Sequence, residues 1–118
     1  MSRFEPEGLR ILAQYERRRV PGTPDTGAAF TESLRVDGQG LIPRADPKYC
    51  VQINLKDDPA NYRFPIPPEF NRKGSFIVKA ADLPVKIPFD ADARVSIIET
   101  DRRGEKILAQ SPLRYRTV

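Results

Sequence analysis

Alternation of apolar and polar residues is the dominant pattern of the chain from Tyr49 onward. In the first such stretch, apolar residues at odd positions alternate with polar residues: Tyr49, Val51, Ile53 and Leu55. A period of two is typical of a strand with one buried face. Similar short stretches follow, with turn-forming residues between them: 62–66, 76–80, 85–89, 94–100, 106–110 and 113–117. This spacing predicts six or seven strands in a small antiparallel β-sandwich of Ig-like architecture, or in a barrel.

The N-terminal part has a different periodicity. Apolar residues recur three or four positions apart, as on one face of a helix: Leu9, Ile11, Leu12, Ala13 and Tyr15. Pro6 suits the first turn of a helix, and the basic run 17–19 suits the last. The spacing therefore predicts one short N-terminal helix, which ends at Pro21-Gly22.

Proline and glycine interrupt the segment between this helix and Tyr49. Residues 20–48 contain four prolines and four glycines, and only one short hairpin is indicated, from 30–36 to 41–42. Long irregular segments in small domains are usually functional or serve as linkers. We therefore expect residues 1–48 to form a helix and an extended arm, and residues 49–118 to form the β-domain.

The period of two also predicts which side chains form the core. We expect the odd positions of the first strand to face apolar residues of the later strands. The predicted core residues are Val51, Ile53, Leu55, Phe76, Val78, Val95, Ile97 and Ile107.

The amino-acid composition excludes several kinds of catalytic site, metal site and cross-link. The 118 residues include no histidine and one cysteine, Cys50. A Ser-His-Asp triad, a Cys-His dyad, an imidazole metal site and an internal disulfide are therefore excluded. We expect no catalytic residue, no cofactor and no metal, and we expect the protein not to be an enzyme.

Acidic side chains leave one enzymatic alternative open. Two carboxylates at a suitable separation can hydrolyse a glycosidic bond, and the chain has Asp57-Asp58, Asp90 with Asp92, and the trio Glu99, Asp101 and Glu105. Aspartate is also a favoured turn former, which is the simpler explanation. A small ligand-binding protein or carboxylate-based enzyme remains the third hypothesis.

The net charge of +4 gives a mild attraction to polyanions. The basic clusters are 17–19, 72–73, 102–103 and 114–116, and the last combines two arginines with a tyrosine. Nucleic-acid binding combines such groups with stacking aromatic rings. Acidic residues stand beside most of these clusters, so nucleic acid is possible as a partner but not favoured. The second hypothesis is a small basic module that binds nucleic acid, or that inhibits or regulates a partner protein.

The first hypothesis is a non-enzymatic structural or adaptor protein. We expect it to bind other protein subunits, in a symmetric assembly such as a virion, as a capsid-decorating, head or tail component. The expected location is the cytoplasm at synthesis and then the particle, without membrane contact, because no apolar run reaches about 18 residues. The residues expected to bind the partner are Leu9, Ile11, Leu12, Tyr15, Arg17, Arg18, Arg19 and Phe30.

Overall fold

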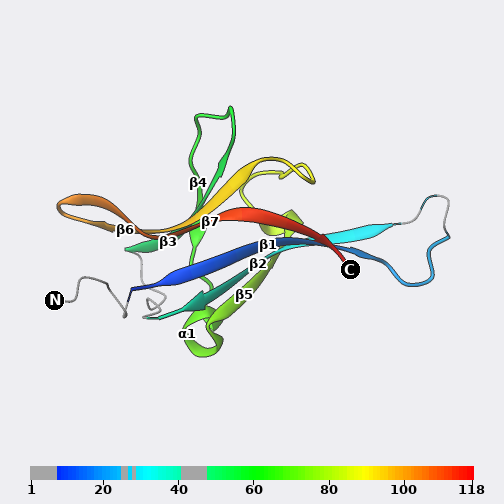
Figure 1. The fold of residues 1–118 in the computed structure, drawn as a ribbon, viewed down its shortest axis with the longest axis horizontal. Coiled ribbons are helices and arrows are strands. Elements are labelled where there is room, and N and C mark those ends of the chain that lie inside the picture. Colours follow the sequence, from blue (N-terminus) through cyan, green and yellow to red (C-terminus); the bar gives the residue numbers. More distant parts are fainter. Residues whose placement is uncertain (1–7, 25–26, 28, 41–47) are drawn as a thin grey trace.

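The chain folds into one mixed β-sheet that curls into a half-barrel (Figure 1). The computed structural model describes residues 8–24, 27, 29–40 and 48–118. The sheet order in this part of the chain is β4-β3-β6-β7-β1-β2-β5, and all neighbours are antiparallel except β7 and β1. The strands are β1 (Arg10–Arg19), β2 (Phe30–Gln39), β3 (Tyr49–Leu55), β4 (Tyr62–Pro65), β5 (Ser75–Lys79), β6 (Ala93–Asp101) and β7 (Gly104–Thr117).

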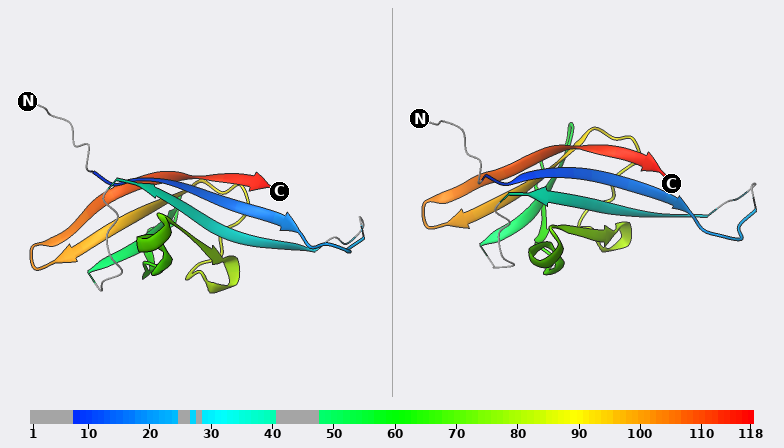
Figure 2. Two further views of the ribbon diagram at one scale, coloured as in Figure 1. Left: turned by 90° about the horizontal axis from the view of Figure 1, so that it is seen from below. Right: turned by 60° about the horizontal axis from the view of Figure 1, so that its bottom comes forward.

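Two short helices lie on the concave side of the sheet (Figure 2). They are α1 (Glu69–Lys73) and the 3-10 turn η1 (Ala80–Asp82), which flank β5 in the chain. The mainly β prediction is therefore confirmed. The Ig-like sandwich is not: a single sheet accounts for the described strands, and its parallel β1–β7 pair makes it mixed.

The predicted N-terminal helix is wrong, because residues 10–19 form strand β1. This strand pairs with β2 over its whole length and with β7 from Ala13 to Arg17. Its odd positions point into the half-barrel, where Ala13 and Tyr15 are buried. Leu12 lies on the opposite, convex face and is 42% exposed. This exposed leucine produced the helical spacing, whereas the buried residues follow a period of two.

The predicted arm also contains a regular element. Residues 30–39 form β2, which lies between β1 and β5, with Leu34 and Val36 in the core. The predicted hairpin partner 41–42 and the predicted helix start at Pro6 lie outside the described residues. The two parts of the chain thus contribute strands to the same sheet.

The core fills the concave side of the half-barrel. Of the predicted core residues, Val51, Ile53, Phe76, Val95 and Ile97 are buried, and Leu55 and Val78 are half-buried. Ile107 is wrong, because its side chain is 54% exposed. A β-bulge between Ile97 and Ile98 shifts the register of β7, and Ile107 then lies on the β6–β7 hairpin that projects beyond the core (Figure 1).

Proline accounts for one difference between the predicted and the observed strands. The predicted strand 85–89 is absent: the segment is irregular, and Pro84 and Pro88 have no N–H for a ladder. Ile87 is nevertheless buried in the core.

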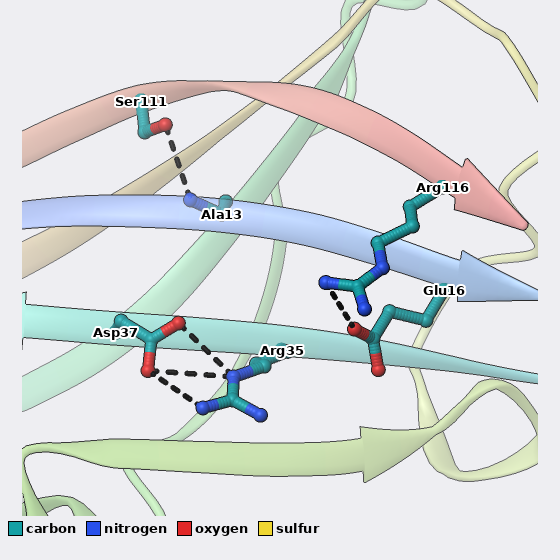
Figure 3. A network of polar contacts seen from close by, with 6 residues as sticks. All are labelled: Ala13, Glu16, Arg35, Asp37, Ser111 and Arg116. Atoms are coloured by element: carbon teal, nitrogen blue, oxygen red, sulfur yellow. Dashed lines mark hydrogen bonds and ion pairs between the residues drawn. The ribbon is translucent and has the colours of Figure 1, made fainter. Parts of the chain in front are cut away.

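At the β1–β7 junction, the Ser111 hydroxyl accepts the Ala13 N–H at 3.2 Å, beside Pro112 (Figure 3). This side-chain bond extends the parallel ladder by one contact.

Candidate protein-binding surface at the β5 edge

The sheet separates the residues that the sequence predicted to bind a partner. Most of them belong to the concave side: Leu9, Ile11, Tyr15, Arg17, Arg19 and Phe30. Leu12 and Arg18 lie at even positions of β1 and therefore on the convex side. A helix would have grouped these side chains on one face, but the strand does not.

Aromatic rings enclose an ion pair at one end of the concave side. The Arg17 guanidinium carbon lies 4.2 Å from the Phe30 ring centre and 5.3 Å from that of Phe89, which are cation–π distances. Its Nε is 3.8 Å from Glu32 Oε2. The Tyr15 hydroxyl donates a hydrogen bond of 2.9 Å to Glu32 Oε1. The carboxylate of Glu32 thus already has two partners within the chain.

The neighbouring phenols are held in their neutral form. Burial, followed by the hydrogen bond to Glu32, raises the pKa of Tyr15 well above its ordinary value. Burial, followed by the charges of Asp90 and Asp92, raises the pKa of Tyr115 to about 12. The Tyr115 hydroxyl donates to the backbone oxygen of Ala91 at 2.5 Å. Neither phenol can therefore serve as a general base near neutral pH.

Two shallow cavities adjoin this cluster on either side of Glu32 and η1. The larger, of about 610 Å³, is lined by residues 30–33 of β2, by Ile77 and Lys79 of β5, and by residues 80–81. The smaller, of about 420 Å³, is lined by Tyr15, Glu32 and residues 80–81 and 83–86. The larger cavity runs beside the end of β5, so it joins the aromatic cluster to the edge of the sheet.

Among the described residues, no strand lies beyond β5, so the outer edge of β5 is open. A backbone hydrogen bond from Gly38 N–H to Gly74 oxygen, 2.7 Å long, fixes which residues of β5 face β2. Hydrogen-bonded pairs alternate in an antiparallel ladder, so Phe76 and Val78 bond to β2. The peptide groups of Ser75, Ile77 and Lys79 then point away from the sheet, and β5 is the last strand in its order.

The opposite edge is blocked. Strand β4 ends in Pro65, and Pro67 and Pro68 follow it. The Arg63 side chain of β4 points inward across the sheet, where its Nε donates to Gln52 Oε1 of β3 and its Nη2 to Glu105 Oε1 of β7, both at 2.7 Å, so it does not cover the edge. Prolines are a common device that prevents an edge strand from pairing. Only the β5 edge among the described strands therefore presents a free ladder.

Ile77 is the exposed apolar residue on this edge. Its side chain is 52% exposed and lies on the convex face, beside Arg35 of β2. Arg35 is held by Asp37, with Nε to Oδ2 at 3.1 Å (Figure 3). Arg116 and Glu16 form a longer ion pair of 3.8 Å on the same face. An exposed isoleucine thus stands at the edge of a face that carries two ion pairs.

The basic cluster 114–116 does not form a stacking platform. Tyr115 points into the concave side, where its ring centre lies 5.7 Å from that of Tyr15. Arg114 and Arg116 occupy the alternate positions of β7 and face the convex side. The aromatic ring and the charges are therefore on opposite faces of the sheet.

Three of the candidate carboxylates, those of Asp58, Asp101 and Glu105, have partners within the chain. Asp58 accepts the Ala60 N–H and the Tyr62 hydroxyl, and these bonds lower its pKa. Asp101 accepts the Arg103 N–H in the β6–β7 turn. Within the described residues, no group of three or more acidic or cysteine side chains is placed to hold a metal ion.

Cys50 is half-buried on β3. Burial raises the pKa of its thiol, while the nearby Arg63 opposes that shift. The neutral thiol is a poor nucleophile, so this environment does not activate it.

Sequence reasoning missed Glu32, Phe89 and Ile77. Glu32 and Phe89 are distant from Arg17 in the chain, and only the strand pairing brings them together. Ile77 did leave a signal, because it stands between Phe76 and Val78, where alternation calls for a polar residue. Three consecutive apolar residues in a half-buried strand indicate that one of them lies on the solvent side.

Comparisons with known proteins give no relative for this chain. No family model, no curated protein and no solved structure matches it. None of the helices in the described ranges has the length and apolar character needed to cross a membrane.

Proposed function

We propose that this chain is a non-enzymatic structural or adaptor protein that binds other protein subunits in a larger assembly. The observation that carries the proposal is the open β5 edge, with the exposed Ile77 at its centre. An unpaired edge is a template for a strand of another chain. The opposite edge has prolines instead, as expected if only the β5 edge is kept for binding.

The cavity beside this edge supports the same proposal. The larger cavity lies next to Phe30 and Ile77, which are 40% and 52% exposed. A partner that paired with the edge would also cover these side chains. Aromatic residues are enriched at the energetically important centres of protein interfaces. A subunit of a symmetric particle such as a virion would use this surface in the same way.

The size of the native complex tests the proposal. Extracts of cells that make the protein from its own gene would be sedimented, and the fractions probed for the chain. We expect the chain to sediment well above the position of a free 13.4 kDa protein. A chain that sediments only as the free protein, in every growth condition in which it is made, contradicts the proposal.

The basic convex face is the observation that favours a second candidate, a nucleic-acid-binding module. Arg18, Arg114 and Arg116 share this face, and Glu16 is the nearest acid on β1. Binding through phosphates would weaken steeply with salt, because counterions are released. Titration of labelled single- and double-stranded DNA and RNA at two salt concentrations distinguishes this candidate from the first.

A further inference from the structure

The β5 edge is self-complementary, and this property identifies a specific partner. We propose that the partner that pairs with β5 is a second copy of this chain, joined by an antiparallel β5–β5 ladder about a two-fold axis at Ile77. The inference rests on the proposed function and names its partner. Three features of β5 support it: the direction of its backbone hydrogen-bonding groups, the exposed Ile77 side chain and the arrangement of its charges.

The outward backbone groups of β5 are arranged symmetrically about Ile77. Strand β5 has five residues, and Ile77 is the middle one. The outward peptide groups are those of Ser75, Ile77 and Lys79, at equal spacing on either side of the centre. In an antiparallel pair centred on Ile77, each Ile77 exchanges both of its backbone bonds with the other copy. Ser75 of one copy then lies opposite Lys79 of the other.

The second feature is the apolar contact. Ile77 of each copy would lie directly opposite its counterpart on the convex face, and directly opposite side chains in a ladder interact. The aliphatic part of Arg35 lies beside each Ile77 in the same row. The pairing would therefore bury the exposed isoleucine against an apolar surface that includes both arginine stems.

The third feature is charge complementarity. The pairing places Lys79 opposite Ser75, so no like charges meet directly. Asp37 of β2, which already pairs with Arg35 of its own chain, is the neighbour of Ser75 on the other side, so Lys79 would join an existing ion pair. The small serine lets the Lys79 side chain of the other copy extend over it toward Asp37, which is two strand spacings, about 10 Å, away. Each copy offers one lysine and one aspartate, so the complementarity is reciprocal, as a two-fold interface requires.

The experiment measures self-association by sedimentation equilibrium over a range of protein concentrations. Three variants would be compared with the wild type: Ile77→Lys, Ile77→Pro and Ile107→Lys. Proline at position 77 removes only an outward N–H, so it leaves the bonds between β5 and β2 in place. Ile107→Lys is the matched control, since Ile107 is an isoleucine of nearly the same exposure, 54% against 52%. Circular dichroism would establish that each variant is folded.

We expect the wild type and Ile107→Lys to dimerise with the same dissociation constant. Ile77→Lys and Ile77→Pro should raise this constant by at least about tenfold, the effect of losing about 1.4 kcal/mol. A wild-type chain that stays monomeric at all concentrations overturns the inference. A dimer that all variants retain also overturns it, because the contact then lies elsewhere.

A cross-link tests the register. In a Cys50→Ser background, Ile77→Cys would place two thiols on directly opposite residues, whose Cα atoms are about 5.5 Å apart in a hydrogen-bonded pair. This separation allows a disulfide, so diamide should oxidise Ile77→Cys to a covalent dimer much faster than Ile107→Cys. Equal rates for the two variants contradict the pairing. If the chain is monomeric when pure but sediments with other proteins in extracts, the second copy is excluded as the partner while the proposed function stands.

Discussion

At the residue scale, a glycine in β2 leaves the space that α1 needs to pack beneath the sheet. Gly38 of β2 lies against the ring of Phe70, and a Cβ atom at this position would come within 2.7 Å of that ring. The φ angle of Gly38 is not in the left-handed region, so space alone accounts for the glycine. Phe70 in turn contacts Phe76, with ring centres 5.4 Å apart. Gly38 therefore sets how α1 and β5 pack.

Gly38→Ala should destabilise the protein by about 1–3 kcal/mol, because the methyl group forces the Phe70 ring to move. Urea denaturation measures this loss. The double variant Gly38→Ala/Phe70→Leu is the control: the two effects should be clearly less than additive, because the smaller side chain relieves the clash. Strict additivity would show that the ring and the glycine are not in contact.

The buried phenols predict a loss of stability at alkaline pH. The pKa of Tyr115 is raised to about 12 in the folded chain, from an ordinary value of 10.0, and that of Tyr15 is raised further. Folding therefore favours the protonated phenols. Their contribution is fully present below pH 10 and is lost as the pH rises from 10 toward 12.

Absorbance at 295 nm, recorded together with circular dichroism during a pH titration, checks this expectation. The part of the signal due to Tyr15 and Tyr115 should appear only as the fold is lost. The variant Tyr115→Phe should retain its fold to a higher pH. Complete ionisation of all four tyrosines near pH 10 in a folded protein would contradict the burial of these two rings.

At the scale of the elements, the sequence predicted the strands that have one buried and one polar face. Residues 49–55 and 94–100 were found this way, and Val51, Ile53, Val95 and Ile97, at odd positions, are buried; in β6 the even positions Ser96 and Ile98 are buried as well. Strand β1 was misread because Leu12 is exposed on the convex side, and because its other partner, β7, is about 100 residues away in the sequence. Local spacing carries no information about such a long-range pairing.

The candidate site was predictable only in part, for the same reason. Tyr15, Arg17 and Phe30 were selected as surface contacts of a helix and an arm. They do lie near the proposed surface, but strand pairing with Glu32 and packing against Phe89 position them. The open edge itself depends on which strand is last in the sheet, and no local pattern encodes that order.

Two isoleucines, one buried and one exposed, test which residues form the core. Ile53→Ala should cost about 2–5 kcal/mol, because Ile53 is fully buried and its removal leaves a cavity. Ile107→Ala should change the free energy of unfolding by less than about 0.5 kcal/mol, as expected for an exposed position. Denaturant midpoints of the two variants provide the measurement. Equal losses at both positions would be inconsistent with the bulge that turns Ile107 outward.

At the scale of the whole molecule, the half-barrel depends on both ends of the chain. Strand β1 joins β7 to β2, and β5 is attached to the sheet through β2 alone. Without residues 10–39, no strand pairing connects β4, β3, β6 and β7 to β5, and only the α1 segment and the packing of Phe64 against Phe76 remain.

Deletion of residues 1–48 should abolish cooperative folding. It removes two strands and the buried side chains of Ala13, Tyr15, Leu34 and Val36. Thermal unfolding followed by circular dichroism checks this. A truncated chain that unfolds cooperatively, with the same β-signal per residue as the full chain, would show that residues 49–118 form an independent domain.

Residue-resolved amide hydrogen exchange tests most directly whether β5 is an open edge that is used for binding. In dilute protein, the amides of Phe76 and Val78 should be protected, because they bond to β2, while those of Ile77 and Lys79 should exchange quickly. In the assembled state, the amides of Ile77 and Lys79 should become protected as well. Protection of Ile77 in the dilute monomer, or fast exchange of Ile77 in the assembly, would contradict the account.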